Sequence, residues 1–225
     1  MFYTCLKGLI VKLAIVQPNF FPYKSYYDLA KKVDKFIFLD DTNYNSKNWV
    51  NKTLIKLNSS NYYFRIPVDY KEGKFVPTKE IKFKNDKWKN KFLKLIRVQY
   101  KNEINFNLVY PLLEEIINLP IDNVCHISAY SVFRICDQLN FGTEFTFSSI
   151  SHGNIKGKYH DKIVEIAKKE KADTYYTFAR HKGEFNESKF LKTNIKISYF
   201  TSYSSNFSII DDIMSNPIYT DFLKK

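Results

Sequence analysis

The chain has 225 residues, of which 44% are hydrophobic and 26% are charged. These proportions are those of an ordinary soluble protein, and a chain of this length can bury a core without disulfide or metal staples. The net charge is +12, but only four of the 35 basic residues are arginines. Because arginine is the preferred residue for phosphate and base contacts, we do not expect nucleic acid to be the main partner.

Targeting and redox features of the chain point to the cytoplasm. Lys7 and Lys12 interrupt the apolar start, and no small-residue cleavage site follows. No apolar stretch reaches the length of a membrane span, so we expect no stable membrane insertion. Cys5, Cys125 and Cys136 are odd in number and lack metal-type spacing, which favours reduced thiols over a disulfide framework. The histidine spacing fits no zinc pattern either, and we expect no metal.

The most informative segment runs from Leu13 to Asp41. A short apolar run stops at Gln17-Pro18, a loop and a helical pattern follow, and a second apolar run ends in two carboxylates. This order predicts a strand, a helix and a parallel strand, the unit that builds a parallel sheet with a ligand crevice at its carboxyl edge. Six polar or aromatic side chains are expected to wall this crevice: Gln17, Asn19, Tyr23, Tyr26, Asp40 and Asp41.

Beyond residue 41 the pattern predicts an α/β fold. Residues 53–57 and 62–68 flank an Asn-Ser-Ser-Asn turn and predict a β-hairpin. Three apolar stripes at helical spacing predict a helical lobe inserted at about residues 85–140. Strands are then predicted at 143–147, 174–178 and 195–200, and helices at 158–171 and 207–214. Together these elements predict a single domain, residues 1–225, with a mostly parallel sheet and flanking helices.

Several segments resemble the WbqC-like family in order and spacing. They are Gln17-Pro18-Asn19-Phe20-Phe21-Pro22-Tyr23, Trp49-Val50-Asn51-Lys52, Phe147-Ser148-Ser149, residues 172–176 and residues 207–211. The resemblance extends from about Val11 to Ser215. It implies a cytoplasmic enzyme of O-antigen, lipopolysaccharide or other surface-polysaccharide biosynthesis. The implied reaction attaches glycine or a similar acyl group to the amine of a nucleotide-linked amino sugar.

A weaker resemblance concerns nucleotidyltransferases with a His-x-x-His signature. In those enzymes a strand and a loop lead to the signature, and Tyr23-Lys24-Ser25-Tyr26 occupies the corresponding place here. Tyrosines cannot replace histidines as protonated donors to a transferring phosphate at neutral pH. The opening unit is therefore expected to be Rossmann-like or nucleotidyltransferase-like, without adenylyl-transfer chemistry.

The reaction implied by the resemblance needs a group that removes a proton from an amine. Asp41 could do so if it is buried or paired, although Asp40 and Asp41 could equally cap the turn that follows them. A neutral imidazole of His160 or His181, near the ends of the late strands, is the other candidate base.

Substrate contacts are predicted around the same edge of the sheet. Gln17 and Asn19 could fix a sugar or base through their amides, or could only cap the strand. Trp49, with Asn51 and Lys52, could stack on a ring and clamp a diphosphate, or could be an edge of the core. The other candidate binding residues are Tyr23, Tyr26, Ser148, Ser149, Tyr176 and Lys182.

We expect transfer of an acyl or aminoacyl group, such as glycyl, to the amine of a nucleotide-linked amino sugar. The protein would contribute position, desolvation and a general base. No phosphate-cradling glycine loop indicates ATP or coenzyme A, so the acyl donor and any cofactor are unknown. Two alternatives stay open: a non-catalytic nucleotide-sugar-binding protein, and a nucleic-acid-binding protein.

Overall fold

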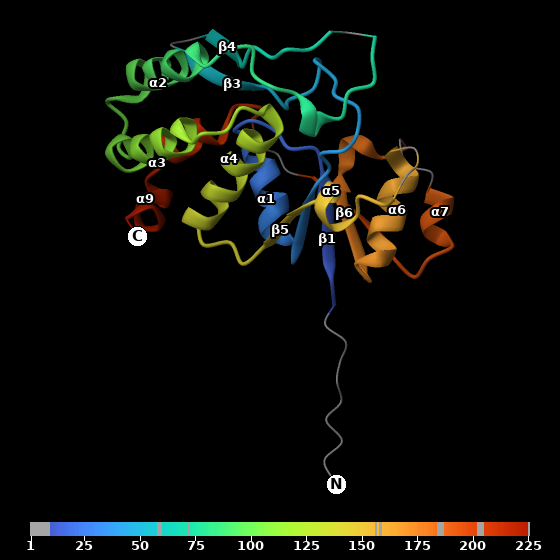
Figure 1. Cartoon of the computed structure of the whole chain (residues 1–225). Coiled ribbons are helices and arrows are strands. Elements are labelled where there is room, and N and C mark those ends of the chain that lie inside the picture. The colour runs from blue at the N-terminus through green and yellow to red at the C-terminus, as the bar shows by residue number, and fades with distance from the viewer. Residues whose placement is uncertain are drawn as a thin grey trace.

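The structure is a computed structural model that describes residues 10–57, 60–71, 73–155, 157, 159–183, 187–201 and 205–224. Within these residues, five strands form a parallel sheet in the order β5-β2-β1-β6-β7 (Figure 1). The strands are β1 (Lys12–Val16), β2 (Lys35–Phe38), β5 (Glu144–Phe147), β6 (Thr174–Phe178) and β7 (Lys196–Phe200). The predicted α/β fold with a mostly parallel sheet is confirmed.

The opening unit forms as the sequence predicts. β1 leads through α1 (Lys24–Lys32) to β2, which pairs with it in parallel, with Leu13 opposite Lys35. On its other side β1 pairs with β6, so β1 is the central strand. The chain therefore leaves β1 toward one half of the sheet and later returns to the other half. The carboxyl ends of β1 and β6 flank this switch point, where open α/β sheets bind ligands.

Helices cover both faces of the sheet. Leu13 and Ile15 of β1 lie in an apolar cluster with α6 (Tyr159–Lys169) and α7 (Glu187–Leu191). Ala14 points to the opposite face, into a larger cluster with α1 and α4 (Val124–Gln138). Side chains alternate between faces along a strand, and parallel strands are stable when both faces are buried in this way.

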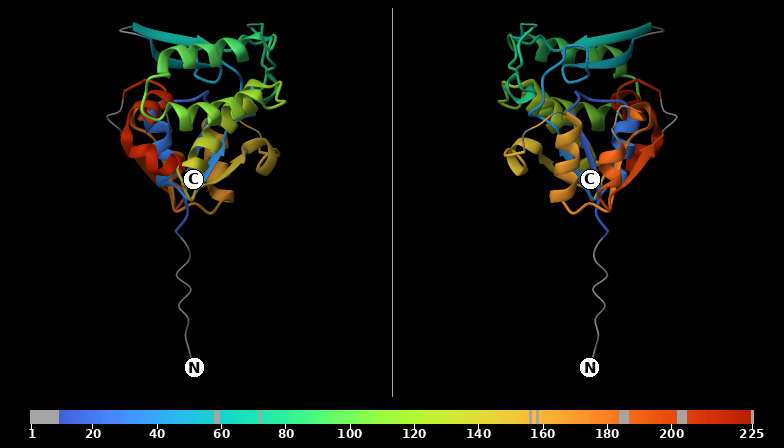
Figure 2. Two further views of the ribbon diagram at one scale, coloured as in Figure 1. Left: turned by 90° about the vertical axis from the view of Figure 1, so that its left-hand side faces the viewer. Right: turned by 90° about the vertical axis from the view of Figure 1, so that its right-hand side faces the viewer.

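The segment between β2 and β5 caps the carboxyl edge of the sheet. Its hairpin, β3 (Lys52–Leu57) and β4 (Ser60–Arg65), is antiparallel, as predicted. Ser60 and Asn61, predicted in the turn, instead pair with β3, and residues 58–59 lie outside the described residues. Helices α2 (Lys87–Tyr100), α3 (Phe106–Asn118) and α4 follow where the helical lobe is predicted. Figures 1 and 2 show the hairpin and α2 as a layer beyond the strand ends. Phe64 and Phe92 join these two elements edge to face, with ring centroids 4.9 Å apart.

The remaining elements are short. They are α5 (Ser148–Ser151), α8 (Ile209–Ser215), α9 (Thr220–Leu223) and 3-10 turns at Thr78–Glu80, Ala179–His181 and Pro217–Tyr219. The second hairpin strand is shorter than predicted, because Pro67 lacks the N–H needed to continue a ladder. α8 begins after Ser208, whose hydroxyl accepts the backbone N–H of Ile210 at 3.2 Å.

Candidate functional site

Four segments that are far apart in the sequence meet at the carboxyl edge of the sheet. β5 is followed by Ser148, β2 by Leu39 and then Asp40-Asp41, β1 by Gln17, and β6 by the turn that contains Arg180. Parallel pairing places these ends next to one another in the order of the strands. Polar groups from both halves of the chain are thereby gathered along one edge.

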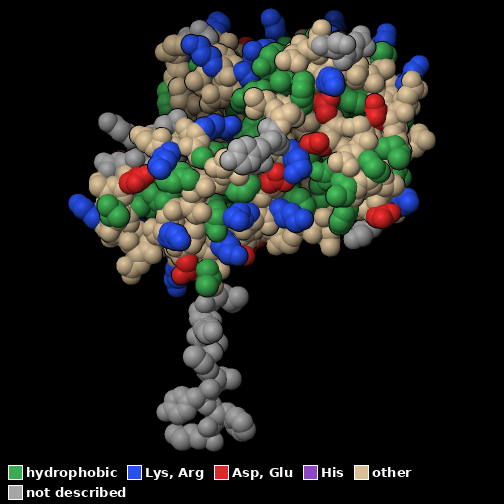
Figure 3. Space-filling view, turned by 180° about the vertical axis from the view of Figure 1, so that it is seen from behind, with side chains coloured by type: hydrophobic (Ala, Val, Ile, Leu, Met, Phe, Trp, Pro, Cys, Tyr) green, Lys and Arg blue, Asp and Glu red, His purple; other side chains and the backbone are tan. Residues whose placement is uncertain are grey.

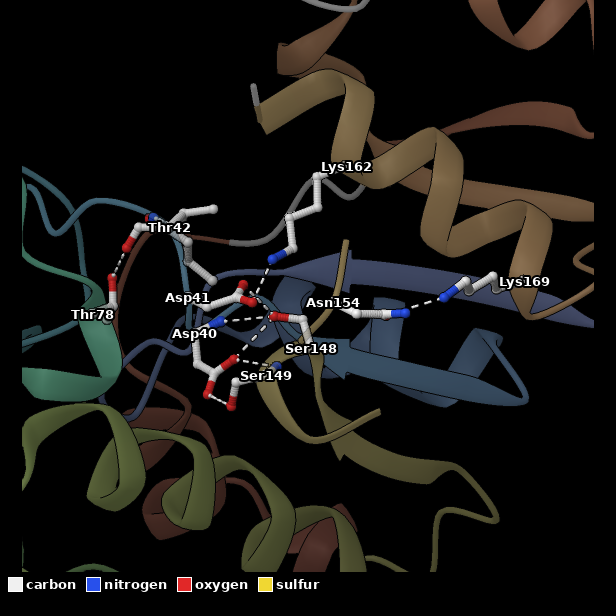
Figure 4. Close-up of polar contacts among 10 residues, drawn as sticks. Asp40, Asp41, Thr42, Thr78, Ser148, Ser149, Asn154, Lys162 and Lys169 are labelled. Carbon is white, nitrogen blue, oxygen red and sulfur yellow. Dashed lines mark hydrogen bonds and ion pairs between the residues drawn. The ribbon is translucent and has the colours of Figure 1, made fainter. Parts of the chain in front are cut away.

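Asp40 is buried, and its carboxylate is held by hydrogen bonds (Figure 4). It accepts the Ser148 hydroxyl at 2.9 Å, the Ser149 backbone N–H at 2.9 Å and the Ser149 hydroxyl at 2.6 Å. These bonds tie the end of β2 to the start of α5. Satisfied buried carboxylates of this kind support structure. Ser148 and Ser149, predicted as binding residues, therefore point to the aspartates.

Asp41 forms an ion pair with Lys162, which comes from the first turn of α6 (Figure 4). The Ser148 hydroxyl lies 2.7 Å from the other oxygen of the Asp41 carboxylate. Only 7% of the Lys162 side chain and 11% of the Asp41 side chain are exposed. Both charges have thus lost most of their hydration, so removing either partner would leave a costly buried charge.

Asp41 and Lys162 line a pocket of about 540 Å³. The 3-10 turn at Thr78–Glu80 contributes Lys79 and Glu80 to the wall of this pocket. The other lining residues are Thr42, Asn43, Phe75, Pro77, Gly153, Ile155, Gly157 and Tyr159. This volume lies within the range of small-molecule sites, and the position outside strand carboxyl ends is the usual one in α/β sheets.

The loop between β1 and α1 is fixed by contacts from three other elements. Phe21 has a φ of 39°, in a region that bulky residues rarely adopt. Its N–H donates to the Ser131 hydroxyl oxygen at 3.2 Å, and its carbonyl accepts the hydroxyls of Thr53 at 2.8 Å and Ser208 at 2.9 Å. Backbone strain that is held in this way often marks loops that present functional groups.

Gln17 joins the pocket to the neighbouring loop. Its Nε2 donates to the hydroxyl of Thr42, a pocket residue, at 3.2 Å, and its Oε1 accepts from Asn48 at 2.7 Å. Its carbonyl accepts the hydroxyl of Tyr26 at 2.8 Å. Burial raises the pKa of Tyr26 well above its ordinary value, so this hydroxyl remains a donor. Tyr26 therefore supports the loop from inside the core.

A row of aromatic rings and cations begins next to Asn48. The Arg180 guanidinium lies 4.6 Å from the ring centroid of Phe178 and 5.1 Å from that of Tyr23, whose hydroxyl it also hydrogen-bonds. The Tyr23 ring is 6.2 Å from Trp49, and the Lys52 ammonium lies 5.2 Å from the centroid of the Trp49 ring. The structure thus brings three predicted binding residues together with Arg180.

Other predicted binding residues have different surroundings. Asn19 and Asn51 are buried, and the Asn51 amide donates to a backbone carbonyl beyond β4 at 2.9 Å. The Tyr176 ring lies 5.7 Å from the ammonium of Lys32, in the last turn of α1 and away from the carboxyl edge. Lys182 is exposed above a tyrosine ring of β7.

The two candidate histidines do not line the pocket that contains Asp41. His160 lies in the first turn of α6 beside Tyr159, with ring centroids 5.1 Å apart. His181 follows Arg180 in a 3-10 turn and contacts the ring of Phe178. The side chain that forms an ion pair with Asp41 is instead Lys162.

Several other titratable groups are buried in the framework. His152 lies 3.1 Å from Glu170, and burial lowers the pKa of its imidazole. Cys125 and Cys136 are free thiols inside α4 whose pKa is raised by burial, which disfavours the reactive thiolate. In the part of the chain that the structure describes, no three His, Cys, Asp or Glu residues gather as a metal site requires.

Sequence reasoning missed Lys162 and Arg180. Lys162 is buried on α6 together with Ile163 and Ile166. A lysine among the apolar residues of a helix is unusual, and this could have indicated that Lys162 has a buried charged partner. Arg180 is one of four arginines in a lysine-rich chain and follows a predicted strand almost directly. Its position just after the carboxyl end of a strand could have indicated a ligand-binding residue.

Charge is dispersed over the face drawn in Figure 3. Lysine and arginine side chains are mixed with acidic ones there, and among the described residues of this face they do not form one continuous stripe. Nucleic-acid-binding surfaces usually show such a stripe. None of the helices in the described ranges has the length and apolar character needed to cross a bilayer.

Comparison with known proteins places the chain in a family. Residues 17–218 match the family model of the WbqC-like proteins. An uncharacterized protein of Mycobacterium tuberculosis, Rv1507c, is 23% identical over 190 residues, which cover 84% of this chain and 81% of that protein. No solved structure shows a significant match. The chain belongs to the WbqC-like protein family.

Proposed function

We propose that the protein transfers an acyl or aminoacyl group, such as glycyl, to the amine of a nucleotide-linked amino sugar. The reaction would serve O-antigen or other surface-polysaccharide biosynthesis and would take place in the cytoplasm. Family membership supports this setting, because the resemblance described above connects WbqC-like proteins with surface polysaccharides. The residues of the pocket support the acceptor chemistry.

The observation that carries the proposal is the buried Asp41–Lys162 pair in the wall of the pocket. An amino sugar brings an ammonium group, whereas the corresponding hydroxyl sugar brings no charge. The Asp41 carboxylate can hold that ammonium and accept its proton, as a positioned general base does. Lys162 keeps the carboxylate compensated while the pocket is empty, and Lys79 supplies a second cation for an anionic substrate.

The chemical step follows from this arrangement. The neutral sugar amine attacks the carbonyl carbon of an activated acyl donor, so that a C–N bond forms and the bond to the leaving group breaks. Asp41 takes one proton from the bound ammonium before the attack and passes it to water. It then takes the second proton from the nitrogen as the C–N bond forms, and this proton leaves to water or to the leaving group. The ammonium of Lys162 would stabilise the negative charge that develops on the carbonyl oxygen. Alignment of the two substrates in one pocket would supply much of the rate.

Binding and turnover test the proposal in sequence. Isothermal titration compares nucleotide-linked amino sugars with the matched sugars that carry a hydroxyl at the same carbon. Mass spectrometry then follows N-acylation with activated glycyl and acetyl donors. We expect Asp41→Asn to lower turnover by about 10²- to 10⁴-fold, the usual contribution of a general base. Asp28→Asn is the matched control, because Asp28 pairs with Lys24 at 2.7 Å on α1, outside the pocket.

Three outcomes would count against the proposal. Equal affinity for amino and hydroxyl sugars, with no acylated product, would show that the pocket does not select an amine as the acyl acceptor. Tight binding without turnover, unchanged in Asp41→Asn, would identify a non-catalytic nucleotide-sugar-binding protein. A response to oligonucleotides alone, weakening steeply with salt, would identify a nucleic-acid-binding protein.

A further inference from the structure

Six side chains form a cationic aromatic patch beside the switch point of the sheet. We define this patch by the rings of Tyr23, Trp49 and Tyr63 and the cations of Lys52, Arg65 and Arg180. Its rings are in sequential contact, Tyr23 with Trp49 at 6.2 Å and Trp49 with Tyr63 at 5.8 Å. Tyr63, Arg65 and Arg180 are exposed and Trp49 is partly exposed, whereas Tyr23 and Lys52 are buried beneath them. The accessible part of the patch therefore offers two rings, Trp49 and Tyr63, and two guanidinium groups.

The hairpin supplies part of the patch from a single face. Lys52 and Arg65 are directly opposite each other in the register of β3 and β4, so their side chains share a face. Tyr63 lies two residues before Arg65 and points to the same side. Like charges in this position normally destabilise a hairpin. Phe64 points to the other face, into the core.

Lys52 is unusual because it is a buried cation. Only 8% of the residue is exposed, and its ammonium donates a hydrogen bond to the backbone carbonyl of Lys47. Burial and the nearby Arg65 lower the pKa of Lys52. Within the described residues, no carboxylate forms an ion pair with Lys52, Arg65 or Arg180. Burying an uncompensated charge costs free energy, so an anion that binds here would relieve it.

Arg180 adds an oriented guanidinium at the end of β6. The rings of Tyr23 and Phe178 lie within 5.1 Å and 4.6 Å of it, and a hydrogen bond to the Tyr23 hydroxyl fixes one nitrogen. The residue remains exposed. A guanidinium that is held in this way loses little entropy when it forms paired hydrogen bonds to a phosphate.

The patch is connected to the pocket that contains Asp41. Gln17 bonds Thr42 in the pocket wall and Asn48, the residue before Trp49. A ligand that extends from one to the other would pass over Gln17 at the end of β1. We propose that the patch binds the nucleoside diphosphate of the substrate, with its phosphates on the cations and its base on the rings. The choice of this ligand rests on the proposed function, which places the sugar in the pocket.

Calorimetry on the full chain tests this inference without any acyl donor. The probes are uridine and thymidine diphosphates, inorganic pyrophosphate and uridine. We expect the diphosphates to bind more tightly than either fragment, and Arg180→Gln and Arg65→Gln each to weaken them by about 10- to 100-fold. Arg97→Gln is the matched control, because Arg97 also stacks on a tyrosine, Tyr110 at 4.8 Å, but lies on α2 outside the patch. Unchanged affinity in both patch variants would overturn the inference.

A stability measurement separates an anion site from a structural role. In the absence of ligand, Arg65→Gln removes a like-charge pair and should leave the thermal midpoint unchanged or raise it, although it weakens diphosphate binding. A large fall in the midpoint would show instead that Arg65 is structural. Tighter binding of oligothymidylate than of thymidine diphosphate would also overturn the inference, in favour of nucleic acid.

The proposed function and this inference fail in different experiments. If diphosphate binding depends on Arg180 but no acylated product forms, the inference about the patch is supported and the proposed reaction is refuted. If acylated product forms but Arg180→Gln binds diphosphates as tightly as the wild type, the proposed reaction is supported and the inference about the patch is refuted.

Discussion

The buried ion pair between Asp41 and Lys162 makes the sharpest prediction for stability. The Lys162→Met variant has a side chain of similar length that can keep the apolar contacts of the lysine stem, but it lacks the ammonium group. Asp41 then keeps the Ser148 hydroxyl at 2.7 Å as its hydrogen-bond partner in an environment where 11% of its side chain is exposed. A carboxylate left in that position has lost its water and its counter-ion together.

The expected cost follows from this environment. Breaking a buried pair from one side typically costs about 3–5 kcal/mol, because the remaining charge is uncompensated. The hydroxyl of Ser148 and partial solvent contact reduce this value, so we expect about 2–4 kcal/mol for Lys162→Met. Lys24→Met breaks the pair with Asp28, which lies on the surface of α1, and should cost about 0.5 kcal/mol or less.

Urea denaturation of the wild type, the single variants Lys162→Met, Lys24→Met and Asp41→Asn, and the Asp41→Asn/Lys162→Met double variant measures these values. With a slope of about 2–3 kcal/mol/M, Lys162→Met should lower the midpoint by about 1 M. The double variant should recover at least half of the loss, because neither charge remains. A cost for Lys162→Met no larger than that for Lys24→Met would refute the reasoning, as would a double variant that equals the sum of its single changes.

Three further predictions concern other parts of the fold. The half-buried carboxyl of Asp211 accepts a hydrogen bond from the Tyr100 hydroxyl at 2.7 Å, and burial raises the pKa of this carboxyl to about 6. A carboxyl whose pKa is higher in the folded state stabilises the fold most below its pKa in the unfolded chain. This stabilisation is lost as the pH rises through about 6. Wild type should therefore lose about 2 kcal/mol relative to Asp211→Asn between pH 4 and pH 7, measured as the difference between their unfolding free energies. Tyr26→Phe leaves the Gln17 carbonyl without its 2.8 Å donor and should cost about 1–3 kcal/mol in urea, and a value near zero would show that the bond is not formed. Phe92→Ala removes a ring packed on Phe64 and should cost about 3–5 kcal/mol, with an intact circular dichroism spectrum at low urea as the control.

Much of the fold could be predicted from local patterns. Apolar runs that end at Gln17 and near Asp40 indicated β1 and β2, and the three helical stripes indicated α2, α3 and α4. The order of the strands could not be predicted in this way. It depends on pairings such as Lys35 with Glu144, which join distant segments and leave no periodic signal in either one.

The candidate site was less predictable than the fold, for a physical reason. A polar residue at a strand end looks the same in sequence whether it faces a cavity or satisfies a neighbour. Ser148 bonds the aspartates and Tyr26 supports a loop, whereas Asp41 lines the pocket. Only the positions of their partners distinguish these cases. Lys162 stayed hidden because lysine is abundant throughout this chain.

The bond between Asp40 and Ser148 has a consequence for how the chain assembles. Its two ends are 108 residues apart, so β1, α1 and β2 are synthesised long before their outermost neighbour exists. Until β5 arrives, the Asp40 carboxylate must remain hydrated at the rim of a half-built sheet. Closing so long a loop is entropically costly and slow. We therefore expect β5 to dock late and to detach first, so that its amides exchange with deuterium sooner than those of β1.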